Sequence, residues 1–373
     1  MSTASLTRKT DLVPRRFVSR LAVALWLAAL VWLLATWSGH YPIDLDVYRL
    51  GGLAWLEGRS LYVGFTGPPL DPQLPFTYPP IAAMLFSGLS LVPGALRNPL
   101  VVASGFVALT AVCVAVAGKV RPDLKWTAGL LAAIGALALD PVWTTYGYGQ
   151  INLFLLGLVV IDVVLLKDKR RRGVLIGIAA AIKLTPAIFV LYFIARRDWR
   201  AAITTVATFT GLAFAGFLIT PRDSLQYWLH SLLNPDRIGD MSLSTNQSIR
   251  GLLRGFGLAP GVETLLWAAL AAVVVAAAFF VARKTRDDLV ALFVVAGAGL
   301  LASPVSWLHH WVWCVPVLVF LALRGNAWPA FAAVFLVFVT RLHEFDTYVW
   351  LTVITLGALA FRAVRVPSPH ATR

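Results

Sequence analysis

Residues 17–37 read FVSRLAVALWLAALVWLLATW, and this stretch decides the class of fold because its length and apolarity suit lipid better than water. At a rise of 1.5 Å per residue, a helix of this length covers about 30 Å, the thickness of the hydrocarbon core of a bilayer. The run is too long for a removable signal peptide, and no small-residue cleavage site follows it. We therefore expect a first membrane-spanning helix that stays in place as an anchor.

The composition of the whole chain supports the same class. Of 373 residues, 59% are hydrophobic and 13% are charged, and the mean hydropathy is +0.77, whereas soluble proteins carry roughly 25% charged residues. The net charge of +14 comes from short basic clusters between apolar runs, which is typical of membrane topology rather than of nucleic-acid binding. Cys113 and Cys314 lie inside apolar runs and predict neither a disulfide framework nor a metal site. We expect an all-α polytopic membrane protein with no nucleic-acid partner.

Basic residues orient the predicted helices, because lysine and arginine concentrate in the cytoplasmic loops of membrane proteins. The basic clusters lie at 8–20, 119–125, 167–172, 196–200, 283–286, 324 and 362–373. Placing all of them in the cytoplasm predicts a cytoplasmic tail at 1–16, a single transmembrane domain at 17–363 and a cytoplasmic tail at 364–373. The domain then carries a first external loop at 38–97 and a large external loop at 220–260. Within the first loop, residues 79–92 are apolar but too short to span, so they fit juxtamembrane helix.

The segment 173–195 requires a separate prediction, since basic clusters flank it on both sides and Lys183 and Pro186 interrupt its middle. We expect a re-entrant pair of half-helices that turns at 183–186, which a membrane tolerates only where the broken backbone lines a cavity or is covered by protein. The alternative is one proline-kinked helix whose Lys183 ammonium reaches the interface. The re-entrant pair predicts a polar cavity inside a bundle of about 11–12 membrane helices.

In this topology the remaining polar clusters all fall on the external side. They lie at 44–48, 58–62, 76–80, 146–152, 246–248, 303–310 and 341–346. Loops between helices can hold such clusters together at the mouth of a cavity, whereas the cytoplasmic connections are short and basic. We expect the functional site at this external end.

The residue types at that end suit transfer of a phosphate-linked sugar. An aspartate such as Asp44 or Asp46 would take the proton of an acceptor hydroxyl, and cations would neutralise a departing lipid phosphate. One base is enough for direct displacement, which inverts the anomeric centre. Retention through a covalent intermediate would need a second carboxylate close by, and Asp44 leaves that alternative open. The spacing of the two acids also resembles that of metal-dependent transferases, but no further carboxylate cluster supplies oxygen ligands for a divalent ion.

A set of motifs adds a family resemblance to these inferences. The motifs read DLDVY at 44–48, GRSLY at 58–62, FTYPP at 76–80, YGQIN at 148–152, IKLTP at 182–186, NQS at 246–248 and SPVSWLHH at 303–310. In this order they resemble glycosyltransferase family 87, whose members are multispanning enzymes of the GT-C class. The resemblance implies inverting transfer of mannose from polyprenyl-phosphate-mannose to a lipid-anchored phosphatidylinositol mannoside. It further implies an α-1,2 linkage, the periplasmic face of the cell membrane, and no metal or cofactor beyond the lipid-linked donor.

The resemblance also assigns roles to residues. It makes Asp46 the general base and His310 the histidine nearest the reacting groups, while Lys183 and His309 would bind the donor phosphate. Adjacent helical residues point about 100° apart, so one of the two imidazoles is enough to face the cavity. The substrate-binding candidates are Asp44, Tyr48, Tyr62, Gln150, Asn152, Asn246, Gln247, Arg250 and Trp307, with Arg254 and Arg341 as further partners for an acceptor phosphate.

Each assignment has a structural alternative. Asp44 or Asp46 would cap a helix that begins near Val47, and we take Asp44 as the capping or supporting residue. The histidines would belong to an interfacial aromatic cluster, and the amides would cap neighbouring backbone.

Other functions also remain open. One alternative is a mannosyltransferase that branches lipomannan or lipoarabinomannan, because enzymes of that kind share these motifs. A transporter or flippase of a lipid-linked sugar would explain the cavity equally well, but transporters usually show paired repeats and polar groups near the midplane. Protein partners are not indicated by any motif, whereas membrane lipids are expected to surround the chain.

Overall fold

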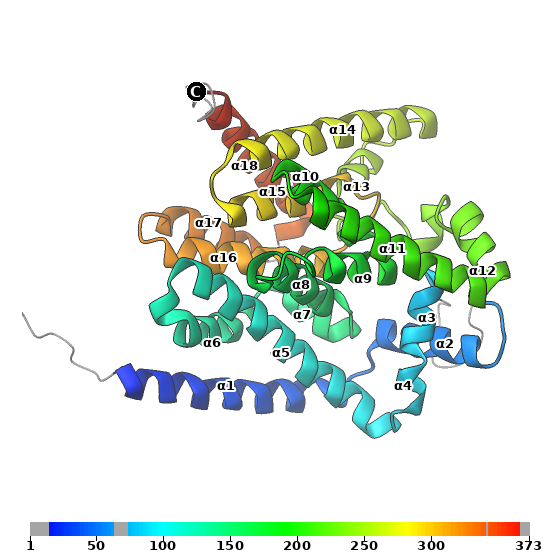
Figure 1. The fold of residues 1–373 in the computed structure, drawn as a ribbon, viewed down its shortest axis with the longest axis horizontal. Helices are drawn as coiled ribbons and strands as arrows, with labels where there is room; N and C mark the ends of the chain where they lie inside the picture. Colours follow the sequence, from blue (N-terminus) through cyan, green and yellow to red (C-terminus); the bar gives the residue numbers. More distant parts are fainter. Residues whose placement is uncertain (1–14, 63–73, 341, 366–373) are drawn as a thin grey trace, which may run out of the picture.

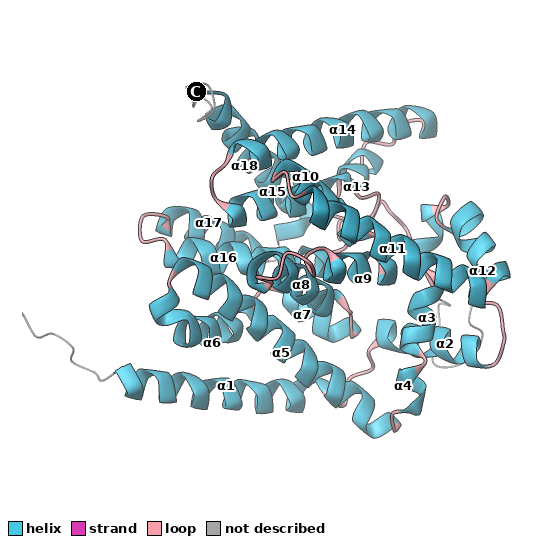
Figure 2. Cartoon of the chain, in the orientation of Figure 1, coloured by secondary structure: helices cyan, strands magenta, loops and turns pink. Residues whose placement is uncertain are grey.

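The computed structural model describes residues 15–62, 74–340 and 342–365 of the chain. Most of the apolar sequence in these ranges forms helix. Figure 2 shows helices joined by loops, with no strand in these described ranges. The helices are α1 (Arg15–Trp37), α2 (Ile43–Leu56), α3 (Pro80–Phe86), α4 (Gly88–Leu91), α5 (Gly94–Val120), α6 (Lys125–Ala136), α7 (Asp140–Tyr148), α8 (Asn152–Val160), α9 (Val174–Ile182), α10 (Val190–Ala195), α11 (Trp199–Ile219), α12 (Pro221–Gln226), α13 (Ile249–Arg254), α14 (Pro260–Lys284), α15 (Asp288–Ala302), α16 (Cys314–Leu323), α17 (Trp328–Val339) and α18 (Thr347–Arg365). Shorter 3-10 or π turns occupy Pro122–Leu124, Ile161–Leu165, Thr185–Phe189, Tyr227–Ser231, Pro235–Ile238, Leu308–Trp313 and Leu342–Phe345. The all-α prediction is confirmed.

Five of the described helices are long and apolar enough to cross a membrane: α1, α5, α11, α14 and α18. The pair Pro122–Ala136 and Asp140–Tyr148, bent by 71°, would count as a sixth span. Shorter apolar helices of 10–17 residues lie at Pro80–Leu91, Asn152–Leu165, Thr185–Ala195, Asp288–Ala302, Leu308–Leu323 and Trp328–Val339. These observations confirm a polytopic membrane protein.

The helices pack into one bundle, and four short ones gather at one end of it (Figure 1). Helix α1 runs along one edge in the view of Figure 1 and α14 along the opposite edge, while α2, α3, α4 and α12 meet at the end where α1 finishes. Helices α3 and α4 are the juxtamembrane segment predicted at 79–92. We call this the loop end of the bundle.

The segment 173–195 is a hairpin, as predicted. Helix α9 stops at Ile182 because Lys183 is extended, with φ −145° and ψ 127°, and the chain resumes in the turn Thr185–Phe189 and α10. Arg172, just before the segment, forms an ion pair of 2.9 Å with Asp198, just after it. Because both ends of the segment meet, the chain has turned back at Lys183 rather than crossed the bundle once.

The start of that hairpin is fixed by a buried carboxylate. Asp162 is fully buried and accepts hydrogen bonds from the backbone N–H of Gly173, at 2.7 Å, and of Ile176, at 3.1 Å. These donors belong to the first turn of α9, which otherwise lacks partners for its N–H groups. The charge of Asp162 therefore anchors the hairpin from the neighbouring helix.

Candidate active site

A cavity of about 720 Å³ opens at the loop end of the bundle. Its walls come from α2, from the turn at Lys183, from the loop before α13 and from the segment that precedes α16. Six residues predicted from the sequence line it together: Asp44, Gln150, Lys183, Trp307, His309 and His310. Segments more than 260 residues apart in the chain thus meet in a single pocket of the size that holds small ligands.

Lys183 lies where the hairpin turns, and its ammonium has two partners. Nζ donates to Oδ1 of Asn152 at 3.0 Å and lies 3.0 Å from Nε2 of His310. A ring N–H of His310 donates to the carbonyl of Val305, which leaves Nε2 as the acceptor for Lys183. An ammonium has three N–H groups, so the third is available to a ligand in the cavity.

His309 lies beside His310, and both imidazoles line the cavity. The two ring centroids are 4.7 Å apart at an interplanar angle of 88°, and the ring of Tyr148 packs edge-on against His309 at 5.5 Å. The side chain of His309 is buried, and neither of its ring nitrogens has a hydrogen-bond partner among the described residues. Its carbonyl accepts from Nδ2 of Asn152 at 2.9 Å, which joins the histidine pair to the Lys183 cluster.

Asp44 lies in the first turn of α2, with its carboxylate at the cavity wall. Burial raises its pKa to about 6, although a hydrogen bond from Gln150 and the charge of Lys183 both act to lower it. The helix begins at Ile43, four residues before the predicted start, and its N-cap residue is Pro42 without any side-chain cap. The prediction that Asp44 caps a helix beginning near Val47 is therefore wrong.

Asp46 is on the other side of the same helix and does not line the cavity. Two helical residues correspond to a rotation of about 200°, so the two acids point in nearly opposite directions. One Asp46 oxygen pairs with Nε of Arg49 at 2.6 Å, and the other accepts from the hydroxyl of Tyr41 at 3.0 Å. The predicted base is thus held in an ion pair outside the cavity.

Tyr48 and Tyr62 form a layer behind the cavity wall. The hydroxyl of Tyr48 donates to Oε1 of Gln150 at 2.8 Å and lies 2.9 Å from the hydroxyl of Tyr78. The hydroxyl of Tyr62 donates to the carbonyl of Tyr78 at 2.8 Å. Both predicted substrate contacts therefore fix residues that line the cavity, and neither lines it.

Asn246 and Gln247 fasten the large loop. Gln247 is fully buried, donates to the carbonyl of His343 at 2.7 Å and accepts from the N–H of Tyr348 at 3.1 Å. Asn246 accepts from the N–H of Ser306 at 2.9 Å. With these amide groups occupied, both side chains join the loop to its neighbours and do not line the cavity.

The arginines predicted for an acceptor phosphate lie away from the cavity. Nε of Arg250 pairs with Glu263 at 2.7 Å, and Nε of Arg254 pairs with the other oxygen of the same buried carboxylate at 2.8 Å. Neither arginine lines the cavity. Arg341 is outside the residues that the structure describes.

Several lining residues were not among the predicted site residues. Tyr78 and Tyr148 stand in the quoted motifs and could have been chosen, because aromatic faces commonly border ligand pockets. Tyr227 and Asp240 line the opposite wall, from the large loop, and no sequence pattern marks them. Across the described part of the chain, no group of three or more histidine, cysteine, aspartate or glutamate side chains has the arrangement of a metal site.

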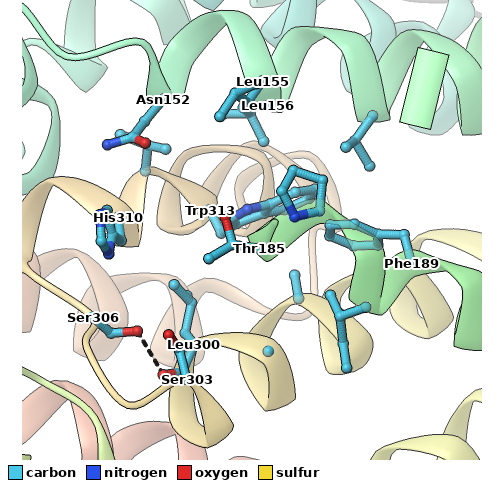
Figure 3. Close-up of a pocket in the computed structure, with 16 residues that line it drawn as sticks. Asn152, Leu155, Leu156, Thr185, Phe189, Leu300, Ser303, Ser306, His310 and Trp313 are labelled. Atoms are coloured by element: carbon cyan, nitrogen blue, oxygen red, sulfur yellow. Dashed lines mark hydrogen bonds between the residues drawn. The ribbon is translucent and has the colours of Figure 1, made fainter. Parts of the chain in front are cut away.

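A smaller pocket extends from the cavity past His310 (Figure 3). It encloses about 50 Å³, and in Figure 3 Asn152 and His310 lie on one side of it and Phe189 on the other, with Thr185 and Trp313 between them. A space of this size has room for water but not for a sugar.

Known proteins resemble the chain over most of its length. Residues 76–304 match the model described as glycosyltransferase family 87. The chain is 38% identical over 330 residues to a "Polyprenol-phosphate-mannose-dependent alpha-(1-2)-phosphatidylinositol mannoside mannosyltransferase" of Mycobacterium tuberculosis (strain ATCC 25618 / H37Rv), a match that covers 81% of this chain and 77% of the relative. A relative with the same name in Mycolicibacterium smegmatis (strain ATCC 700084 / mc(2)155) is 38% identical over 82% of this chain and 76% of its own length.

A second kind of relative is somewhat less similar. A "Polyprenol-phosphate-mannose-dependent alpha-(1-2)-phosphatidylinositol pentamannoside mannosyltransferase" of the same Mycolicibacterium strain is 34% identical over 83% of this chain and 78% of its own length. No solved structure matches the chain.

Proposed function

Because the chain belongs to glycosyltransferase family 87, we propose that it transfers mannose from polyprenol-phosphate-mannose to a hydroxyl of a phosphatidylinositol mannoside, forming an α-1,2 linkage. The names of its 38% identical relatives support this donor and this class of acceptor. Transfer is inverting and takes place on the periplasmic side of the cell membrane.

The observation that carries the proposal is that Asp44 and Lys183 face one cavity. Asp44 takes the proton of the acceptor hydroxyl, whose oxygen attacks the anomeric carbon of mannose. The bond from that carbon to the phosphate oxygen breaks, and polyprenyl phosphate departs. The ammonium of Lys183, already aligned by Asn152 and His310, stabilises the negative charge of the leaving phosphate.

We assign the base to Asp44 rather than to Asp46. Asp44 lines the cavity. Its pKa of about 6 leaves the carboxylate largely ionised at neutral pH yet more basic than that of an exposed aspartate. Asp46 is already paired with Arg49 and faces away. The neighbouring carboxylate Asp46 does not line the cavity, so a single base, Asp44, supports direct displacement over a covalent intermediate.

The histidines complete the donor site in this proposal. His310 holds Lys183 in place through Nε2, and His309, whose ring nitrogens are unpartnered among the described residues, donates to the donor phosphate. Lys183 and His309 supply the charge and the hydrogen bonds for the leaving group, so we propose that the reaction uses no metal or other cofactor.

The periplasmic orientation rests on charge. Arg172 and Arg196 lie in the basic clusters at the two ends of the hairpin, and Lys183 lies at its turn. If the basic clusters are cytoplasmic, the turn and the cavity that it borders open toward the other compartment. Labelling of single cysteines introduced near the cavity mouth, with a reagent that does not cross membranes, tests this orientation.

A matched pair of variants tests the chemistry. Purified wild-type protein should release polyprenyl phosphate from polyprenyl-phosphate-mannose when a phosphatidylinositol mannoside is present. Asp44→Asn should lower turnover by about 10³-fold, whereas Asp46→Asn should keep most of it at saturating acceptor, because that carboxylate does not reach the cavity. Comparable activity in Asp44→Asn would remove Asp44 from the mechanism. Movement of the donor lipid across a vesicle membrane without its consumption would support the flippase alternative instead.

A further inference from the structure

A second cavity, of about 580 Å³, lies apart from the one just described. It is a groove between α5 and α8, which pack against each other, and it ends at residues of α3 and α4. Its lining is almost entirely apolar, with Val101, Ala108 and Ala111 from α5 facing Phe154 and Leu158 from α8. A surface of this kind on membrane helices fits a hydrocarbon chain.

The length of the groove corresponds to one leaflet. From Val101 to Ala111 the helix α5 rises by about 15 Å, which is half of the hydrocarbon thickness of a bilayer. Ala108 and Gly157 form the floor of the groove, where the two helices come so close that a Cβ atom added to Gly157 would contact the Ala108 methyl at 3.9 Å. The groove therefore accommodates a chain from the leaflet on the loop side of the bundle.

Arg97 is fixed to the loop end of the groove, and Arg49 lies near it. Arg97 donates from Nε to the carbonyl of Leu89 at 3.0 Å and from Nη2 to the carbonyl of Val92 at 3.1 Å, and both of these residues line the groove. Arg49 and its partner Asp46 are close enough to act electrostatically on the Arg97 guanidinium. Two guanidinium groups and one carboxylate leave a net charge of +1 where the apolar lining ends.

We propose that this groove and its arginines bind the phosphatidyl anchor of the acceptor, with an acyl chain along α5 and the phosphodiester against Arg49 and Arg97. The inference rests on the proposed function and deepens it. A phosphodiester carries one negative charge, which complements the net charge at the mouth. Asp46 is then a positioning residue that holds Arg49 beside Arg97.

The wall between groove and cavity supports an acceptor lipid rather than the donor. Leu45, Gly149 and Ile182 line the groove, and the residues next to them in the chain, Asp44, Gln150 and Lys183, line the cavity. A donor whose phosphate contacts Lys183 already has its head on the cavity side of that wall. Arg49 and Arg97 therefore fit the phosphate of the acceptor lipid. The acyl chain of the acceptor would lie in the groove while its mannose reaches Asp44 in the cavity.

A groove-filling variant and a neighbouring control test the proposal. Ala108→Phe fills the groove, whereas Val107→Phe adds the same ring at the adjacent exposed position of α5. With purified protein, Ala108→Phe should raise the KM for phosphatidylinositol mannoside about tenfold. It should leave unchanged the KM for polyprenyl-phosphate-mannose and the KM for a deacylated, water-soluble mannoside. Val107→Phe should change none of the three. Ala111→Phe serves as a second filling variant if Ala108→Phe lowers the melting temperature.

Removing the positive charge of Arg49 should change the KM values in a different way. Arg49→Gln should raise the KM for both the acylated and the deacylated acceptor, because both retain the phosphate, and Arg49→Lys should restore much of the affinity. A higher KM for the donor in the filling variants would overturn the proposal in favour of a polyprenyl chain in the groove. Unchanged KM values for both lipids would overturn it in favour of ordinary bilayer lipid.

A binding experiment separates this inference from the proposed function. Binding of phosphatidylinositol mannoside and of polyprenyl phosphate to the wild type and to Ala108→Phe is measured without turnover. Loss of binding of the first lipid alone supports the groove assignment even if the wild type shows no mannosyl transfer. Transfer by the wild type together with equal binding by both proteins would leave the proposed function standing and remove the groove assignment.

Discussion

The ammonium of Lys183 lies 3.0 Å from Nε2 of His310, and both groups face the cavity that also contains Asp44. The contact holds a flexible lysine side chain in one direction, which matters because a preorganised charge stabilises a leaving group without first having to be oriented. Asn152 and His310 occupy two of the three ammonium N–H groups, so one remains for a phosphate oxygen.

Lys183→Met should lower kcat by roughly 10²-fold to 10³-fold, the usual cost of removing one preorganised donor to a developing charge. The KM for the donor should rise more than that for the acceptor, because Lys183 contacts the donor phosphate in our proposal. Steady-state kinetics with each substrate varied in turn measures the difference. Lys183→Arg is the matched control and should recover part of the rate, since it keeps the charge. Wild-type kinetics in Lys183→Met would exclude a role for the ammonium.

The rate should depend on pH through Asp44. Burial raises the pKa of this carboxyl group to about 6, so it is protonated, and unable to act as a base, below that pH. On this basis kcat/KM should rise by about tenfold per unit up to pH 6 and level off near pH 7. A profile measured from pH 4.5 to 8 tests this. Asp46→Asn should keep the same midpoint, and a midpoint that moves with Asp46 would return the base to that residue.

Gln247→Ala should destabilise the protein rather than weaken substrate binding. The substitution leaves the N–H of Tyr348 and the carbonyl of His343 without their buried partners, at a cost of about 3 kcal/mol. Thermal unfolding in detergent should show a melting temperature lower by roughly 5 °C. Gln226→Ala, at an exposed position of α12, should leave it unchanged. A raised KM at normal stability would instead support the predicted contact with sugar.

Gly173→Ala should loosen the hairpin that carries Lys183. Gly173 has φ +92°, and a Cβ atom there would overlap the backbone oxygen of Ala201. Strain and overlap together should cost at least about 2 kcal/mol. Gly211→Ala in α11 is the control, since its Cβ would meet nothing within 4 Å and alanine favours helix. Equal melting temperatures for the two variants would contradict this account of the turn.

Much of the architecture could be predicted from the sequence because charge and length act locally. The hairpin at 173–195 follows from basic residues on both sides of a short apolar segment, and the pair of Arg172 with Asp198 confirms it. The cavity could be anticipated as well, since a lysine at such a turn requires polar surroundings.

The direction in which individual side chains point could not be predicted. Asp44 and Asp46 differ by two residues on one helix, and the packing of that helix against the rest of the bundle decides which acid reaches the cavity. Asn246 and Gln247 have the chemistry of sugar ligands, yet long-range partners such as Ser306 and Tyr348 use their amides. Contacts between residues 60 or 101 positions apart leave no mark in a single sequence.

Tyr48→Phe should move the pH profile without touching the cavity. The hydroxyl of Tyr48 holds Oε1 of Gln150, and the hydrogen bond from Gln150 lowers the pKa of Asp44. Without the hydroxyl, Gln150 is less well fixed and that bond weakens, so the pKa of Asp44 should rise further and the midpoint of kcat/KM should shift upward by about half a unit. Tyr62→Phe is the control, because its hydroxyl reaches only the backbone of Tyr78. An equal shift in both variants would mean that general loosening of the aromatic layer, and not the Gln150 hydrogen bond, sets the basicity of Asp44.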